Sequence, residues 1–161
     1  MENAPIFNCK TADDVLKAVK DYNVSFVQFW FVDIVGTLKS FQITPSELEL
    51  AFEEGMGFDG SSIMGFCRID ESDMVAIPDP TTFQLVSWRP TERPVARVFC
   101  DIKNPDLSPY VGDSRFIMKR MLDKAAEKGY TLYLGPELEF FLFGSMTEPE
   151  IIDVGGYFDA P

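Results

Sequence analysis

The fold is decided by the stretch VSFVQFWFV at residues 24–32, the most apolar part of the chain. Valine, phenylalanine and tryptophan dominate it, and these residue types favour β-strands. The turn residues DIVG follow at 33–36, and residues 37–43 fit a return strand, so the sequence predicts an antiparallel hairpin. Because Gln28 interrupts it, and because it is far shorter than the ~20 residues of a membrane span, the stretch is no membrane helix.

Helices are predicted on both sides of this hairpin. Residues 11–23 carry apolar side chains at helical spacing, and Thr11 is suited to cap them. A second helix begins after the hairpin, where Thr44 and Glu47 have the spacing of a capping box and Gly55 can end the helix.

The region after the second helix predicts more β-structure. A glycine-rich loop at 55–66 is followed by strand-like segments at 74–77, 83–88 and 95–102, which prolines separate. Two strands, a helix and then further strands indicate an α+β fold in which one helix packs on a small mixed sheet. A β-grasp arrangement fits this order.

A domain boundary is predicted at residues 103–112, where proline, serine and glycine cluster. A helix capped by Asp113 or Ser114 then runs to Lys128, and residues 130–143 are strand-like. The helix is expected to turn four apolar side chains inward: Ile117, Met121, Leu122 and Ala125. One helix and one hairpin bury little apolar surface, so we expect this second domain to be incomplete.

We therefore divide the chain into an amino-terminal helix at 1–21, a β-grasp domain at 22–107 and the beginning of a further domain at 108–161.

The composition excludes several classes of protein. Hydrophobic residues make up 46% of the 161 residues and the net charge is −12, which is typical of a globular protein that binds neither nucleic acid nor anionic membranes. No leader segment is recognisable, and three scattered cysteines fit reduced thiols, so we expect a cytoplasmic protein. The absence of histidine, together with thiols that are not grouped, argues against a zinc site.

Glu137 and Glu139 are the first candidate site residues. Side chains two apart in a strand point to one face, and two such carboxylates need a cation or protons when they are buried. Hard oxygen ligands suit magnesium or manganese. Spacing alone favours the alternative of two solvated glutamates on an exposed edge, whereas Phe141 and Phe143 on the same face favour a site.

The glycine-rich loop is the second candidate. Asp59, Ser61 and Ser62 lie within it, and a carboxylate there could bind ammonium and accept its proton. The alternative is a flexible connector. Arg68 and the acidic residues that follow it at 70–73 fit solvated surface, where such pairs interact weakly.

Four segments together carry a resemblance to a known family: FDGSS at 58–62, RIDESDM at 68–74, GPELEFFLF at 135–143 and GGYFD at 155–159. Their order and spacing resemble those of the type I glutamine synthetases, in particular the α-type branch, from about residue 11 to residue 161. The resemblance implies a β-grasp domain followed by the truncated start of a catalytic domain, which consists of an antiparallel sheet with helices. It also implies an ATP-dependent ligase that makes glutamine from glutamate and ammonium through γ-glutamyl phosphate.

The resemblance assigns roles to individual residues. It implies that Glu139 and Glu137 are ligands of two divalent cations, Mg or Mn, with the Glu137 cation at the ATP phosphates. It implies that Asp59, with Ser62 nearby, is lent to the neighbouring subunit of a dodecamer, where Asp59 binds and deprotonates ammonium. Arg68 falls where the α-type branch carries an arginine linked to feedback inhibition.

One departure from the family is Leu138, where many members have proline; leucine keeps the strand alternation. The family's other metal ligands and most of its ATP site would follow residue 161, so we expect the isolated chain to be inactive. Two alternatives remain open: a stand-alone β-grasp interaction module, and a γ-glutamyl-amine ligase.

Overall fold

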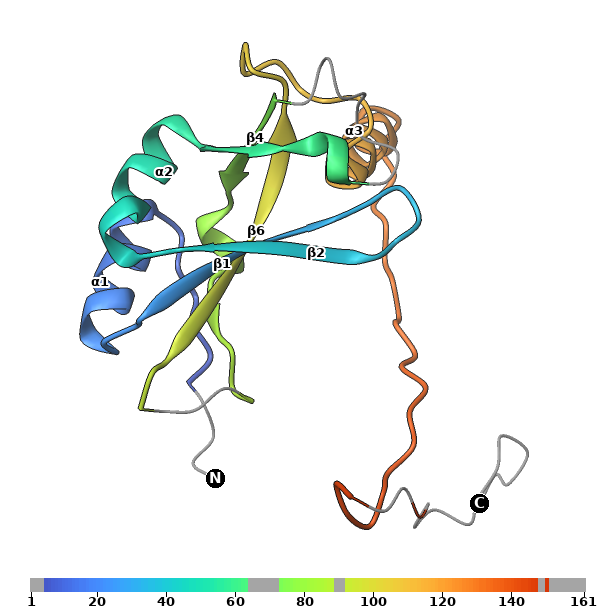
Figure 1. Cartoon of the computed structure of the whole chain (residues 1–161). Helices are drawn as coiled ribbons and strands as arrows, with labels where there is room; N and C mark the ends of the chain where they lie inside the picture. The colour runs from blue at the N-terminus through green and yellow to red at the C-terminus, as the bar shows by residue number, and fades with distance from the viewer. Residues whose placement is uncertain (1–4, 64–72, 89–91, 148–149, 151–161) are drawn as a thin grey trace.

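The computed structural model describes residues 5–63, 73–88, 92–147 and 150, and shows a curled sheet with helices at its side (Figure 1). The elements follow one another as α1 (Ala12–Asp21), β1 (Phe26–Val32), β2 (Leu38–Ile43), the 3-10 turn η1 (Pro45–Glu47), α2 (Leu48–Glu54), β3 (Met56–Asp59), η2 (Gly60–Ser62), β4 (Asp73–Pro78), η4 (Pro80–Thr82), β5 (Gln84–Leu85), β6 (Val95–Lys103) and α3 (Ser114–Glu127).

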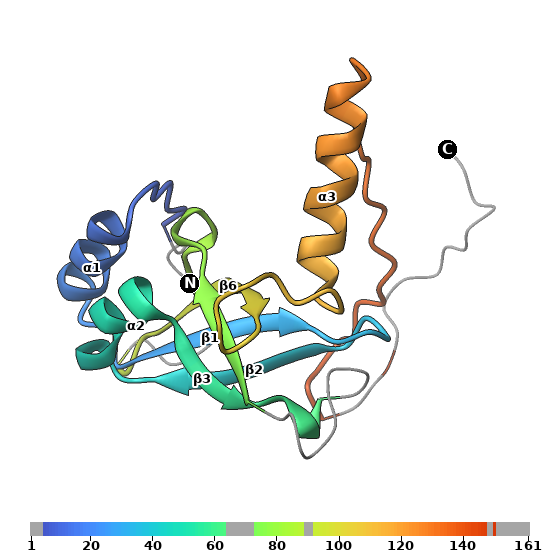
Figure 2. The same ribbon diagram turned by 90° about the horizontal axis from the view of Figure 1, so that it is seen from above.

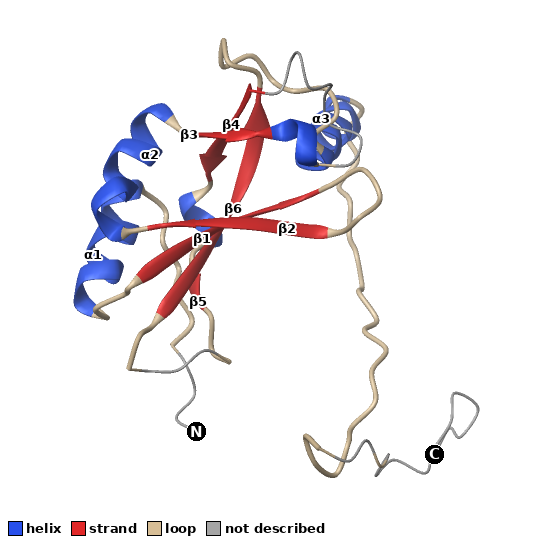
Figure 3. Cartoon of the chain, viewed as in Figure 1, coloured by secondary structure: helices blue, strands red, loops and turns tan. Residues whose placement is uncertain are grey.

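The sheet has the strand order β2-β1-β6-β4-β3, and β5 pairs with β6 beside this path (Figure 3). The predicted hairpin is confirmed, because β1 and β2 pair antiparallel in a register that runs from Val27 opposite Ile43 to Val32 opposite Leu38. Strands β1 and β6 are parallel and the other pairs are antiparallel, so the sheet is mixed. The α+β, β-grasp fold expected from the sequence is confirmed.

The core lies between one face of the sheet and two helices. Along β1, the alternate side chains of Val27, Phe29 and Phe31 are buried, as expected for a strand with one face on the core. Both α1 and α2 contribute buried residues, among them the fully buried Val15 and Leu48. Both predicted helices therefore contribute side chains to the core.

The two helix starts differ from each other. The Thr11 hydroxyl accepts the N–H of Asp14 at 3.2 Å, and the Asp14 carboxylate accepts the N–H of Thr11 at 3.0 Å, which completes a capping box. The capping box predicted at Thr44 is wrong. Within the described residues its side chain caps no backbone N–H; its hydroxyl lies 2.8 Å from that of Ser46. The chain makes a tight 3-10 turn there before α2 begins.

Two strands differ from their predictions. The glycine-rich loop contains β3, which pairs antiparallel with β4 from Met56 opposite Ala76 to Asp59 opposite Asp73. Glycines at 55 and 57 hide this strand in the sequence, because glycine is rare in strands and offers no side chain to pack. Conversely, β5 has two residues rather than the six predicted, because the chain turns at residues 87–88 and the strand ends at Leu85.

The segment after residue 112 forms the predicted helix but not the predicted strand. Asp113 caps α3, yet Ile117, Met121 and Leu122 are 40%, 49% and 38% exposed, so the expected inward face is largely bare. Figure 2 shows α3 projecting from the sheet and the chain continuing as an extended segment. Residues 130–142 form no strand, because a strand needs a hydrogen-bonded neighbour and no described segment supplies one.

No helix in the described part of the chain combines the length and the apolar character that crossing a bilayer requires.

Candidate functional site

Asp59 stands at the end of β3, where the packing of its neighbour sets its direction. Phe58 turns inward, with its ring centre 5.1 Å from that of Phe31 and 5.7 Å from that of Phe41. Because side chains alternate along a strand, this aromatic contact sends Asp59 to the opposite side, where it is exposed. An anchored strand thus presents an accessible carboxylate.

The charge on Asp59 is stabilised locally. One of its carboxylate oxygens accepts the hydroxyl of Ser61 at 2.6 Å and the N–H of Ser61 at 2.8 Å. These hydrogen bonds, first that of the side chain and then that of the backbone, lower the pKa of Asp59 below its ordinary value. The group is therefore an anion at neutral pH and is suited to bind a cation.

Asp73 lies directly opposite Asp59 across the β3–β4 pair, and both side chains are exposed. Like charges in this position repel each other, so a cation near them would relieve the repulsion. From the sequence, Asp73 was expected on a solvated surface, because the pairing that brings it opposite Asp59 depends on strand β3, which glycine hides in the sequence. The alternation of Phe58 and Asp59 was the one signal that could have shown it.

The other predicted residues of this region are less fully described. Ser62 ends η2, the turn that follows Asp59, and the N–H of Ile63 closes this turn on the carbonyl of Gly60 at 3.0 Å. The hydroxyl bonded to Asp59 belongs to Ser61. Arg68 lies outside the described residues.

Glu137 and Glu139 are exposed on the extended segment after α3. The prediction that a strand holds them on one face is wrong for the described chain, since residues 130–142 join no sheet. Their carboxylates are the hard donors that magnesium and manganese prefer. Two such ligands do not complete a site, and the described residues contain no group of three or more histidine, cysteine, aspartate or glutamate side chains able to hold a metal ion.

The sheet and its helices define a β-grasp domain. The chain continues from it through α3 into an extended segment that carries Glu137 and Glu139. The family model for the glutamine synthetase β-grasp domain matches residues 23–105, and the model for the glutamine synthetase catalytic domain matches residues 111–155. The chain belongs to the glutamine synthetase family.

Curated relatives agree with this assignment. The chain is 52% identical over 151 residues to the glutamine synthetase of Mycolicibacterium smegmatis. This match covers 90% of the chain and 34% of the relative. It is 47% identical over 156 residues to that of Methanosarcina mazei, covering 94% of this chain and 35% of the relative. The chain therefore spans about a third of the length of these curated relatives.

Solved structures agree in fold. The Plasmodium falciparum glutamine synthetase superposes with a TM-score of 0.67 at 21% identity, over 80% of this chain and 24% of that one. A GmaS/ADP complex superposes with a TM-score of 0.64 at 22% identity, over 70% of this chain and 25% of that one.

Proposed function

We propose that this chain is part of an ATP-dependent glutamate–ammonia ligase, which forms glutamine through γ-glutamyl phosphate. The observation that carries the proposal is the 52% identity to the Mycolicibacterium smegmatis glutamine synthetase, across 90% of the chain. The two family models, matched in sequence order, support it.

In this proposal Asp59 binds ammonium in the active site of a neighbouring subunit, with Ser62 beside it. The lowered pKa of Asp59 supports the binding role, because the carboxylate stays ionised and attracts a cation. As ammonium loses a proton to Asp59, the freed lone pair of ammonia attacks the γ-carbonyl carbon of γ-glutamyl phosphate, and phosphate leaves. Asp73 strengthens the local negative field.

Glu137 and Glu139 would each supply a carboxylate to one of two divalent cations, Mg or Mn, and further ligands would come from outside these residues. The hard oxygen donors of both side chains fit such ions. When bound, divalent cations supply charge neutralisation for phosphoryl transfer from ATP. The two glutamates would hold these ions near the phosphates and the glutamate substrate.

The proposal extends to organisation and regulation. It includes a homo-oligomer, a dodecamer in the type I family, a cytoplasmic location, and division of the chain at 1–21, 22–107 and 108–161. Arg68 would take part in feedback inhibition by glutamine. The isolated chain is expected to make no glutamine, because its site residues would belong to two incomplete sites.

The two alternatives considered from the sequence are not favoured. A stand-alone β-grasp module does not account for the catalytic-domain match at residues 111–155. The γ-glutamyl-amine ligase is not favoured either, because curated relatives with 44–52% identity to the chain are named glutamine synthetases.

The test is a chimeric enzyme in which this chain replaces the matching segment of the Mycolicibacterium smegmatis glutamine synthetase. We expect ATP- and glutamate-dependent glutamine formation, measured by chromatography. Asp59→Asn should lower kcat/KM for ammonium by roughly 100- to 10,000-fold, the usual contribution of a positioned proton acceptor.

Asp106→Asn is a matched control. Asp106 is also exposed and accepts the N–H and the hydroxyl of Ser108 at 2.9 and 2.5 Å, and these hydrogen bonds lower its pKa in the same way. Its replacement should change kcat/KM by less than about twofold. An Asp59→Asn enzyme that behaved like this control would refute the role of Asp59, and a chimera without activity would count against the ligase proposal.

A further inference from the structure

A buried carboxylate joins the two segments that the family models match. Asp113 is 1% exposed and accepts three backbone N–H groups, from Ile102 at 3.1 Å, Arg115 at 3.2 Å and Phe116 at 3.2 Å. Two of these donors lie in the first turn of α3 and one lies in β6. The same side chain therefore caps the helix and ties it to the central strand of the sheet.

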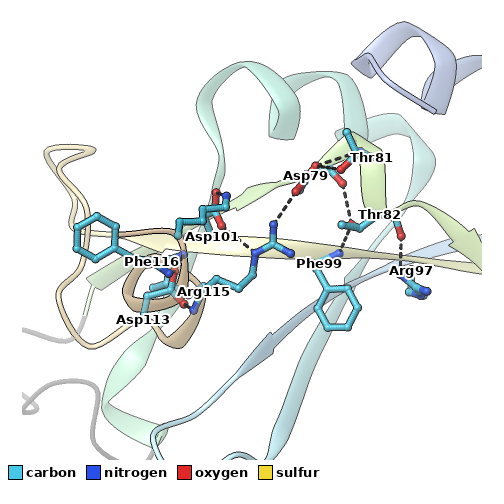
Figure 4. A network of polar contacts seen from close by, with 11 residues as sticks. Asp79, Thr81, Thr82, Arg97, Phe99, Asp101, Asp113, Arg115 and Phe116 are labelled. Carbon is cyan, nitrogen blue, oxygen red and sulfur yellow. Dashed lines mark hydrogen bonds and ion pairs between the residues drawn. The ribbon is translucent and has the colours of Figure 1, made fainter. Parts of the chain in front are cut away.

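Arg115, two residues further on, bridges two carboxylates that belong to the β-grasp body (Figure 4). Its Nη2 donates to Asp79 at 2.5 Å, and its Nε donates to Asp101 at 2.9 Å. Lys119, one turn along α3, donates to the other oxygen of Asp101 at 2.6 Å. Two cations of α3 thus alternate with two anions of the β-grasp body, one in β6 and one at η4.

Both anions are held in place by β6. Asp101 is part of that strand. Asp79 begins η4, where Thr81 donates its N–H and its hydroxyl to the Asp79 carboxylate. The hydroxyl of Thr82 accepts the N–H of Phe99 at 2.7 Å and donates to the carbonyl of Asp79 at 2.7 Å, which fixes η4 to β6.

Polar contacts are the main attachment of α3. Within the described chain, no residue of α3 is buried, so packing of apolar side chains does little to fix the direction of the helix. The Ser114 hydroxyl adds one more tie, to the carbonyl of Val32 at 3.1 Å. Burial by itself would lower the pKa of Arg115, but Asp101 and Asp79 outweigh it and raise the pKa, so the bridging cation is permanently charged.

We propose that Arg115 is a positioning residue, which fixes the direction in which α3 leaves the β-grasp sheet and so sets the spacing between Asp59 and the segment that carries Glu137 and Glu139. The inference rests on the proposed function, in which these residues serve two different active sites. The β-grasp sheet holds Asp59, α3 leads to the segment with the two glutamates, and Arg115 joins the sheet to α3. A planar guanidinium can donate to both carboxylates at once, whereas a lysine ammonium is a single point of charge.

The first test uses kinetics of the chimeric enzyme described above. If Arg115→Gln loosens α3, Asp59 occupies the neighbouring site for a smaller fraction of time, and the KM for ammonium should rise about tenfold while kcat changes less than about twofold. Arg115→Lys should lie between the wild type and Arg115→Gln. A purely structural role predicts the opposite split: kcat falls with the folded fraction and KM is unchanged.

Arg120→Gln is the matched control, since Arg120 lies on the same helix with its guanidinium 5.7 Å from the centre of the Phe116 ring. It removes the same charge from α3 without touching Asp79 or Asp101, and it should leave the KM for ammonium unchanged. Equal effects of the two substitutions would overturn the proposal.

The second test is hydrogen exchange in the 161-residue chain, which does not depend on catalysis. Arg115→Gln should speed exchange in peptides that cover residues 101–117 by at least about fivefold relative to Arg120→Gln. Unchanged exchange would overturn the inference, as would faster exchange together with an unchanged KM. If the chimera makes no glutamine, the proposed function fails, and exchange alone decides whether Arg115 holds α3.

Discussion

Replacement of Gly55 by alanine tests how closely β3 is fitted to the sheet. Gly55 has φ +81° and ψ 178° between α2 and β3, a backbone region that only glycine adopts readily. A Cβ at this position would lie 2.5 Å from the Val75 Cγ1, 2.5 Å from the Ile77 Cδ1 and 3.2 Å from the Ala76 carbonyl oxygen. The Ile77 methyl can rotate away, but the β-branched Val75 side chain is stiff.

The cost has two parts. Backbone strain in this region costs about 1–3 kcal/mol. Overpacking of a close contact costs about 1–3 kcal/mol more. The sum of roughly 2–6 kcal/mol is a large share of the 5–15 kcal/mol that stabilises an ordinary domain.

Gly36→Ala is the matched control, because Gly36 has a similar φ of +86° in the β1–β2 turn but nothing within 4 Å of an added Cβ. It should cost only the backbone strain, about 1–3 kcal/mol. The assay is urea denaturation of the 161-residue chain, followed by far-ultraviolet circular dichroism. With a urea m-value of about 2 kcal/mol/M, Gly55→Ala should lower the midpoint by roughly 1–3 M. Equal midpoints for the two variants would show that the contact with Val75 is absent and that β3 is not packed as described.

Two further predictions concern charge. Glu139→Gln in the chimeric enzyme should raise the Mg or Mn concentration that gives half-maximal activity by roughly 10- to 100-fold. The control Glu127→Gln, at the exposed end of α3, should leave this concentration unchanged. If Glu139→Gln also left it unchanged, Glu139 would no longer be a proposed ligand. Burial by itself would raise the pKa of Asp79, but hydrogen bonds from Thr81 and Arg115 outweigh it, so the folded-state pKa lies below the ordinary 3.8. Asp79 should therefore make the protein more stable than Asp79→Asn by up to about 1 kcal/mol. This extra stability should be complete above about pH 4 and should disappear as the pH falls through the lowered pKa of Asp79 in the folded protein. Urea midpoints of both proteins, measured between about pH 2 and pH 7, would check this.

The sequence predicted those elements whose signal lies in neighbouring residues. The β-forming residue types of β1 and the turn residues after it predicted a strand and its hairpin, and the apolar stripe of α1 predicted a helix. It failed for β3, because a four-residue edge strand with glycine in it gains its hydrogen bonds from β4 and its anchoring from Phe58, and neither is local in sequence. It failed at Thr44 because a serine hydroxyl two residues away competes for the capping side chain.

In the candidate site too, the residues could be predicted from local sequence but their distant contacts could not. Asp59 could be selected from the sequence as a loop carboxylate, but its hydrogen bonds to Ser61 and its position opposite Asp73 required the structure. The ion pairs of Arg115 were not predicted, because Asp79 lies 36 residues away along the chain. Long-range pairs of this kind leave no periodic signal.

The segment after α3 explains why Glu137 and Glu139 lie outside any strand, whereas Asp59 has a fixed direction at the end of β3. Five large apolar side chains at even-numbered positions from 132 to 142, which would share one face of a strand, are 49–80% exposed: Leu132, Leu134, Leu138, Phe140 and Leu142. Burial of each would add about 1.5–3 kcal/mol, which the described chain does not provide. Contiguous exposed apolar surface of this extent is typical of an interface.

In the proposed enzyme, further protein would cover these side chains and, through the strand alternation, turn Glu137 and Glu139 together toward the opposite face. Asp59 needs no such help, because the packing of Phe58 already fixes its direction. The position of the proposed metal ligands thus depends on assembly with further protein, and the position of Asp59 depends on the β-grasp sheet alone. In the proposal, the ion pairs of Arg115 relate one to the other.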